Sequence, residues 1–106
     1  MNTFDEREKA FEAKFKQDEV LKFKLTAKRN KLLGEWASQV LQKKNPQEYI
    51  KEVRESDLEK PGDEDIIEKL LNDFASNNQE ITREELLQKF SECENKAKVE
   101  LMQENK

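Results

Sequence analysis

The sequence predicts a small all-α protein, a four-helix bundle preceded by a mobile amphipathic segment. Three observations predict this fold. The 106 residues include only two glycines and two prolines, too few for a β-sandwich or barrel that turns roughly every 8–12 residues. Apolar residues recur at helical spacing in several stretches, and capping residues bound these stretches. Charged residues make up 42% of the chain and hydrophobic residues 34%, so the core has to be thin.

The first helical stretch extends from Thr3 to about Lys44. Thr3 and Glu6 have the spacing of a capping box, in which a hydroxyl and a carboxylate satisfy two backbone N–H groups at a helix start. Gly34 lies within this stretch, where glycine costs about 1 kcal/mol relative to alanine. Two explanations stay open: close packing against a neighbouring helix, which we favour, and a hinge beside Trp36. Trp36 itself is predicted to be the central core residue.

The apolar stripe of this stretch is interrupted near position 18. Its three leading aromatic residues lie within about 40° of one another on a helical projection, and these are Phe4, Phe11 and Phe15. Asp18 and Lys22 then point into the stripe, as Arg29 does later, and a charge that faces a core is costly unless it is paired. We therefore predict two parts, a mobile or partner-folded segment at 1–19 and a helical bundle at 20–106.

Three shorter helices follow, and each has an N-cap residue at its start: Asn45, Asp63 and Thr82. Pro46 occupies the first helical position of the second helix. The third helix follows a turn at 60–62 and can end in a left-handed conformation at Asn77 and Asn78. The fourth helix is predicted to fade into a polar tail after about Val99.

The composition excludes several classes of protein. No apolar run approaches the roughly 18–20 residues of a membrane span, and no stretch resembles a signal peptide. We therefore expect a cytoplasmic protein that does not insert directly into a membrane. The chain has no histidine, one cysteine and no glycine-rich phosphate loop. We expect no enzyme activity, no metal site and a buried, reduced Cys93.

Charge is unevenly distributed along the chain. Residues 1–31 carry nine basic and six acidic groups, whereas the whole chain has a net charge of −4. A basic N-terminal region therefore precedes an acidic body. The acidic balance and the lack of a recognisable binding motif argue against nucleic acid as a partner. The acidic run at 63–65 is best explained as favourable charge at a helix N-terminus, not as a metal site.

Two sets of residues are candidates for binding. The phenylalanine stripe is either a side of the core or a recognition stripe that enters a groove on a partner, and the residues favour neither strongly. The second set is a basic cluster, whose members are Lys22, Lys24, Lys28, Arg29 and Lys31. A solvated helix face is the simplest interpretation of this cluster. Binding of phosphate groups or of an acidic protein surface is the alternative.

Three blocks of the sequence resemble one known family. Residues 4–15 read FDEREKAFEAKF, residues 26–37 read TAKRNKLLGEWA, and residues 61–65 read PGDED. Each block closely resembles part of the zeta subunit of alphaproteobacterial F-type ATP synthases, which forms the ATPase inhibitor subunit zeta family. The blocks occur in the family's order, and the resemblance covers nearly the whole chain.

The resemblance implies a four-helix bundle whose mobile N-terminal region inhibits ATP hydrolysis. In that family, this region enters a catalytic interface of the enzyme head, contacts the rotor shaft and blocks rotation in the hydrolytic direction. Here it would correspond to residues 1–19, and the contact residues would be Phe4, Arg7, Phe11 and Phe15. The protein would be a monomer when free, would need no cofactor and would reach the inner membrane only through ATP synthase.

Two positions depart from the family's pattern. Gln17 lies near a position where members carry histidine, and Lys28 stands where arginine is common. Without histidine, a pH response would have to use carboxylates. The alternative function is a nucleotide-sensing regulatory protein without inhibitory activity. Such a protein would bind ADP or ATP through the basic residues Lys24, Lys28, Arg29 and Lys31.

Overall fold

The structure is a computed structural model that describes residues 6, 9–10, 13–14, 16–56 and 63–104. This part of the chain contains four long helices and no strand, and the helices are α2 (Glu19–Val40), α3 (Pro46–Ser56), α4 (Glu64–Ser76) and α5 (Arg83–Glu104). The predicted all-α fold with four helices is confirmed. The predicted mobility of the N-terminal segment concerns residues that lie largely outside the described ones.

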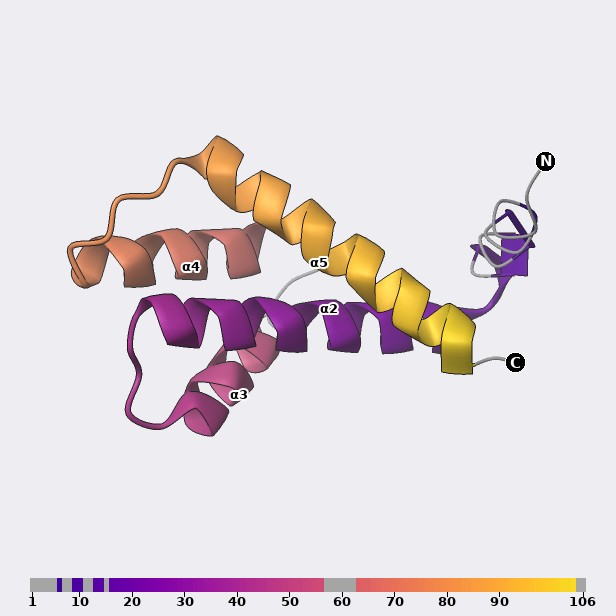
Figure 1. The fold of residues 1–106 in the computed structure, drawn as a ribbon, viewed down its shortest axis with the longest axis horizontal. Helices are drawn as coiled ribbons and strands as arrows, with labels where there is room; N and C mark the ends of the chain where they lie inside the picture. Colours follow the sequence, from indigo (N-terminus) through magenta and orange to yellow (C-terminus); the bar gives the residue numbers. More distant parts are fainter. Residues whose placement is uncertain (1–5, 7–8, 11–12, 15, 57–62, 105–106) are drawn as a thin grey trace.

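α2 is the central helix of the fold (Figure 1). In this view α3 and α4 lie on opposite sides of its C-terminal half, whereas α5 runs in the opposite direction to α2 and crosses its N-terminal half. The most extensive helix–helix contacts join α2 with α3 and α2 with α5. The helix that directly follows the N-terminal segment is therefore also the helix around which the bundle is organised.

The main core forms around the C-terminal half of α2. All four helices contribute to it, and its buried side chains are Leu33, Ala37, Leu41, Tyr49, Val53, Ile66, Ile67, Leu70, Phe74, Leu86, Phe90 and Cys93. Trp36 is not at its centre, so that prediction was wrong. Trp36 is only partly buried at the edge of the core, with its ring 5.3 Å from that of Phe74. Lys89 lies over the indole from the surface side, at 5.5 Å from the ring centre.

A second apolar cluster lies apart from the main core. It joins the N-terminal half of α2 to the C-terminal end of α5, and its members are Leu25, Ala97, Leu101 and Met102. The prediction of a polar tail after Val99 was therefore wrong, because α5 continues to Glu104. Leu101 and Met102 stand among polar residues at the end of α5, and they are buried because α2 passes beside them.

Of the three N-caps predicted within the described residues, two formed, whereas Thr3 of the first predicted capping box lies outside these residues. Asn45 accepts a hydrogen bond from the Glu48 N–H at 3.2 Å, as an N-cap residue should. Thr82 and Glu85 form the complete capping box: the Thr82 hydroxyl accepts from the Glu85 N–H at 3.0 Å, and the Glu85 carboxylate accepts from the Thr82 N–H at 3.3 Å. Asn78 takes a φ of 58° after α4, which confirms the predicted left-handed ending.

Asp63 precedes α4, but its side chain makes no capping hydrogen bond, contrary to the prediction. Its carboxylate instead accepts a hydrogen bond from the Arg29 guanidinium at 2.9 Å. Asp63 also has a ψ of 0° and not the extended backbone in which an N-cap side chain reaches the first N–H groups of a helix. Glu64, the next residue, forms an ion pair with Arg83 at the start of α5.

Gly34 allows α2 and α3 to approach closely, which confirms the favoured explanation for a glycine within a helix. A Cβ atom at this position would lie 3.1 Å from the Ile50 Cα atom and 3.2 Å from its Cγ1 atom. Because the Ile50 Cα atom belongs to the backbone, this atom cannot move away from an added Cβ atom unless α3 itself shifts.

We expect Gly34→Ala to lower the free energy of unfolding by about 1 kcal/mol. Overpacking typically costs about 1–3 kcal/mol, and the helix propensity of alanine returns about 1 kcal/mol of that cost. The measurement is urea unfolding followed by circular dichroism. Gln39→Ala, at an exposed site in the same helix, is the matched control and should leave the midpoint nearly unchanged. A stabilised Gly34→Ala variant would contradict the close approach.

Candidate functional site

The candidate site is the N-terminal half of α2, where the predicted inhibitory segment joins the bundle. Asp18 is the N-cap residue of α2, and its carboxylate accepts hydrogen bonds from the N–H groups of Val20 at 2.9 Å and Leu21 at 3.3 Å. A side-chain oxygen that satisfies these groups gives a helix a start of its own. The charge that interrupted the apolar stripe in the sequence therefore marks the beginning of α2.

The predicted contact residues of the N-terminal segment lie outside the described residues. These are Phe4, Arg7, Phe11 and Phe15. The segment's described positions before Asp18 are helical and exposed, and they are Glu6, Lys9, Ala10, Ala13, Lys14, Lys16 and Gln17. The phenylalanine stripe thus stays a prediction, and two alanines of the same segment face solvent.

The second apolar cluster holds the first turns of α2 against the end of α5. Leu25 is 3% exposed and Leu101 1% exposed, and burial of such side chains contributes about 1.5–3 kcal/mol each. Lys28 adds an ion pair at the surface, with its Nζ atom 2.9 Å from Glu104 and 3.9 Å from Glu100. The hydrogen bond to Glu104 raises the pKa of Lys28. This half of α2 is therefore fixed mainly by α5.

Arg29 is buried between the two apolar clusters. Its guanidinium donates to the Asp63 carboxylate at 2.9 Å, lies 3.5 Å from a Glu94 oxygen and covers the Phe90 ring at 4.2 Å. It also donates twice to the Asn30 side-chain oxygen, at 3.1 and 3.0 Å. These partners compensate for the free energy that is lost when the Arg29 cation is removed from water. Arg29 thus connects α2 with the start of α4 and the middle of α5.

The structure does not gather the predicted basic contact set on one open face. Arg29 is 4% exposed, and Lys28 binds the end of α5. Lys24 and Lys31 are exposed, and their spacing of seven residues places them on the same side of α2. That this set contacts a nucleotide or an acidic partner stays a prediction, and among its members Lys24 and Lys31 are exposed whereas Arg29 is buried.

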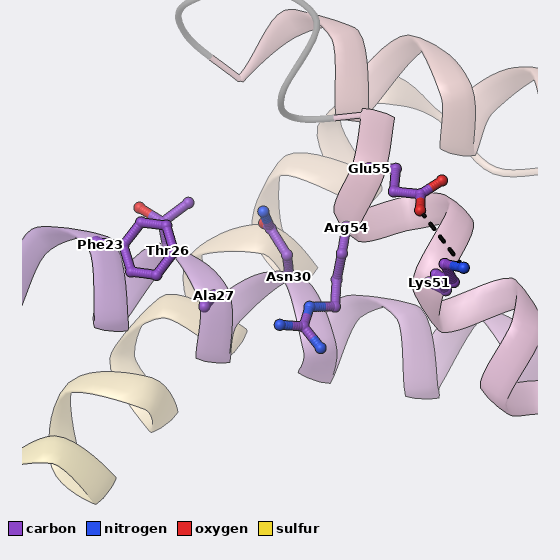
Figure 2. Close-up of a pocket in the computed structure, with 7 residues that line it drawn as sticks. All are labelled: Phe23, Thr26, Ala27, Asn30, Lys51, Arg54 and Glu55. Atoms are coloured by element: carbon purple, nitrogen blue, oxygen red, sulfur yellow. Dashed lines mark ion pairs between the residues drawn. The ribbon is translucent and has the colours of Figure 1, made fainter.

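Sequence reasoning missed Phe23, which is 70% exposed on α2. It lines a cavity of about 320 Å³ between α2 and the C-terminal end of α3, and Figure 2 shows the residues around it: Phe23, Thr26, Ala27, Asn30, Lys51, Arg54 and Glu55. The signal was available in the sequence, because Phe23 falls outside the stripe formed by Leu21, Leu25 and Leu32.

The described residues contain no arrangement suited to metal binding, since no group of three acidic, cysteine or histidine side chains is close enough together. Burial and a hydrogen bond to Asp73, 2.7 Å away, raise the pKa of Tyr49. Cys93 is buried, which confirms the prediction of a small buried side chain. Burial likewise raises the pKa of its thiol. These groups are held neutral, which suits packing and not nucleophilic chemistry.

Comparison with known proteins identifies the family. The family model described as ATPase inhibitor subunit zeta matches residues 1–100. The chain therefore belongs to the ATPase inhibitor subunit zeta family, as its resemblance implied. A search of curated proteins finds no match. The family is one of inhibitor subunits, so this chain is a regulator of an ATPase.

We expect Arg29→Met to lower the free energy of unfolding by about 2 kcal/mol. Methionine keeps the bulk of the side chain but leaves two carboxylates without their cation, and removal of one partner of a fully buried pair costs about 3–5 kcal/mol. Asp63 and Glu94 are 45% and 37% exposed, so water compensates in part. Urea unfolding measures the effect, with Lys31→Met on the exposed side of α2 as control. Equal stability of the two variants would contradict the role of Arg29.

We expect Leu101→Ala to loosen the N-terminal half of α2 selectively. The cavity would weaken the second apolar cluster, which opens separately from the main core if it is an independent unit. Hydrogen exchange should become roughly tenfold faster or more over residues 19–28, and much less so over α3. Val99→Ala, at a 38% exposed site on α5, is the control. Equal acceleration in every helix would show that the two clusters open together.

Proposed function

We propose that this chain inhibits ATP hydrolysis by F-type ATP synthase through its N-terminal segment, residues 1–19. The segment enters a catalytic interface of the enzyme head and stops rotation of the rotor shaft, while residues 20–106 form the bundle that docks the subunit. The observation that carries the proposal is the match to an inhibitor family over residues 1–100, which includes the whole segment.

The start of α2 supports the proposed separation between an inhibitory segment and a bundle that docks. Asp18 provides α2 with its own N-cap, so α2 does not depend on the residues before it. Positions 6, 9–10, 13–14 and 16–17 are exposed, which leaves the side chains at these positions available to a partner. If residues 3–19 are helical when bound, they span roughly 25 Å, enough to reach into an interface between subunits.

The proposed inhibition is steric and needs no covalent chemistry. Burial of Phe4, Phe11 and Phe15 in the head would contribute about 1.5–3 kcal/mol for each ring, and Arg7 would pair with a carboxylate. The bundle cannot follow the segment into the interface, so it limits the depth of insertion. A rotor that turns against the inserted helix would have to expel it first.

ATP synthase would also determine where the protein is found. The described residues include no helix that is long and apolar enough to cross a membrane. We propose a cytoplasmic protein, monomeric when free, which associates with the inner membrane through the enzyme alone. The alternative, nucleotide sensing through the basic set, has weaker support because Arg29 is engaged inside the protein. Calorimetric titration with ADP tests it directly.

We expect the full chain to lower the ATPase turnover of its cognate head, and a variant without residues 1–17 to have no effect. This deletion keeps Asp18, so the cap of α2 and the bundle should persist, which circular dichroism would verify. The replacement of Phe4, Phe11 and Phe15 by serine in the full chain should also abolish inhibition.

Replacement of Ala10 and Ala13 by serine is the matched control, because on a helical projection both lie on the side of the segment that faces away from the phenylalanine stripe. This variant should inhibit like the unmodified chain. Undiminished turnover with the full chain would refute the proposed function. Full inhibition by the variant without residues 1–17 would instead place the inhibitory surface on the bundle.

A further inference from the structure

We infer that the groove beside Phe23, between α2 and the C-terminal end of α3, is a second docking surface. Its occupant is an acidic helix on the outside of the ATP synthase head that bears an apolar side chain. The inference rests on the proposed function, because it names the same partner. It concerns the bundle, however, and not the segment that inhibits.

Phe23 is the most exposed large hydrophobic residue among those that the structure describes, at 70%. Val20, 61% exposed, precedes it by three residues, and Ala27 follows it by four. These spacings place the three side chains on one face of α2. A short apolar stripe therefore extends along α2 outside both buried clusters, and an aromatic residue at its centre is the kind of anchor that interfaces favour.

The stripe borders a hollow and not a flat surface. The cavity measures about 320 Å³, and Thr26 and Ala27 line it from α2 with short side chains (Figure 2). Arg54 extends from α3 toward α2 along the other wall. An apolar side chain of a partner would be in contact with the Phe23 ring and the Ala27 methyl group, with Arg54 beside it.

The same face of α2 is already covered further along the helix. Gly34 lies seven residues after Ala27 and packs directly against Ile50 of α3. α3 ends at Ser56, and on the earlier turns of this face Val20 and Phe23 are 61% and 70% exposed. A partner helix in the groove would cover the face where α3 stops, and helix-in-groove binding uses anchors that are spaced by helical turns in this way.

Charge around the groove selects an acidic occupant. The Lys51 Nζ atom is 3.9 Å from the Glu55 Oε1 atom, so these two charges largely compensate each other. Arg54 adds a positive charge to the lining of the groove. Lys24 and Lys31 are exposed three residues before and four residues after Ala27. The groove is thus locally basic although the chain carries a net charge of −4. A second copy of this chain would bring two basic rims together, which is unfavourable.

The position of the groove fits a surface that works together with the N-terminal segment. Ala27 lies nine residues after Asp18, about 14 Å along α2. A head surface that receives the segment would therefore come close to the groove. Two linked contacts raise the overall affinity well above that of either alone, because the second forms at a high effective concentration.

The test uses the full chain with Phe23→Ser. We expect roughly tenfold weaker binding to the cognate head, measured by fluorescence titration, with unchanged maximal inhibition of ATPase turnover. Leu87→Ser removes another exposed apolar side chain, 42% exposed on α5, and should bind normally. Arg54→Glu should weaken binding at least as much as Phe23→Ser, whereas Arg54→Lys should retain most of it. Thermal unfolding should be similar for all variants because these sites are exposed.

Unchanged affinity of Phe23→Ser and Arg54→Glu would overturn the inference. Self-association of the unmodified chain in sedimentation, abolished by Phe23→Ser, would also overturn it by identifying a second copy as the occupant. If the unmodified chain binds the head without inhibiting it and Phe23→Ser weakens that binding, the docking surface stands and the proposed function falls. If the unmodified chain does not bind the head, both fall.

Discussion

The arrangement of the helices depends on one buried cation. Arg29 has its guanidinium over the Phe90 ring and between the carboxylates of Asp63 and Glu94. A charge in this position is tolerated only where its partners are brought to it, so the start of α4 and the middle of α5 have to meet α2 at the same level. An apolar residue there would pack without this requirement. The ion pairs therefore select one register of α4 and α5 along α2.

Arg29 also divides the protein into two apolar parts. The main core joins all four helices around the second half of α2, whereas the second apolar cluster joins only the first half of α2 to the end of α5. Leu32 contacts both. The smaller cluster lies next to the segment that the proposed function assigns to inhibition. The part of the bundle nearest that segment thus depends on few buried side chains, and its stability can differ from that of the main core.

Features that depend on neighbouring residues were predictable from the sequence. The caps at Asn45 and Thr82 and the left-handed Asn78 follow from a few adjacent side chains. The burial of Leu101 and Met102 was not predictable, because periodicity does not show which helix passes beside a polar-looking end. Phe23 illustrates the same limit at the candidate site, and Trp36 does so at the edge of the main core: helical spacing groups residues on faces, but the neighbouring helices decide which face is covered.

The antiparallel crossing of α5 over α2 brings the end of α5 beside the start of α2, as the contact of Lys28 with Glu104 shows. Any bulky label fused behind α5 would consequently stand next to the start of α2, which directly follows the segment that the proposed function places in the enzyme. Such a label would hinder insertion sterically, and the weaker inhibition would then be caused by the label and not by the protein. The turn around Asn77 and Asn78 is exposed and lies at the opposite end of the molecule from the end of α5. A small epitope inserted there would leave the entry path clear.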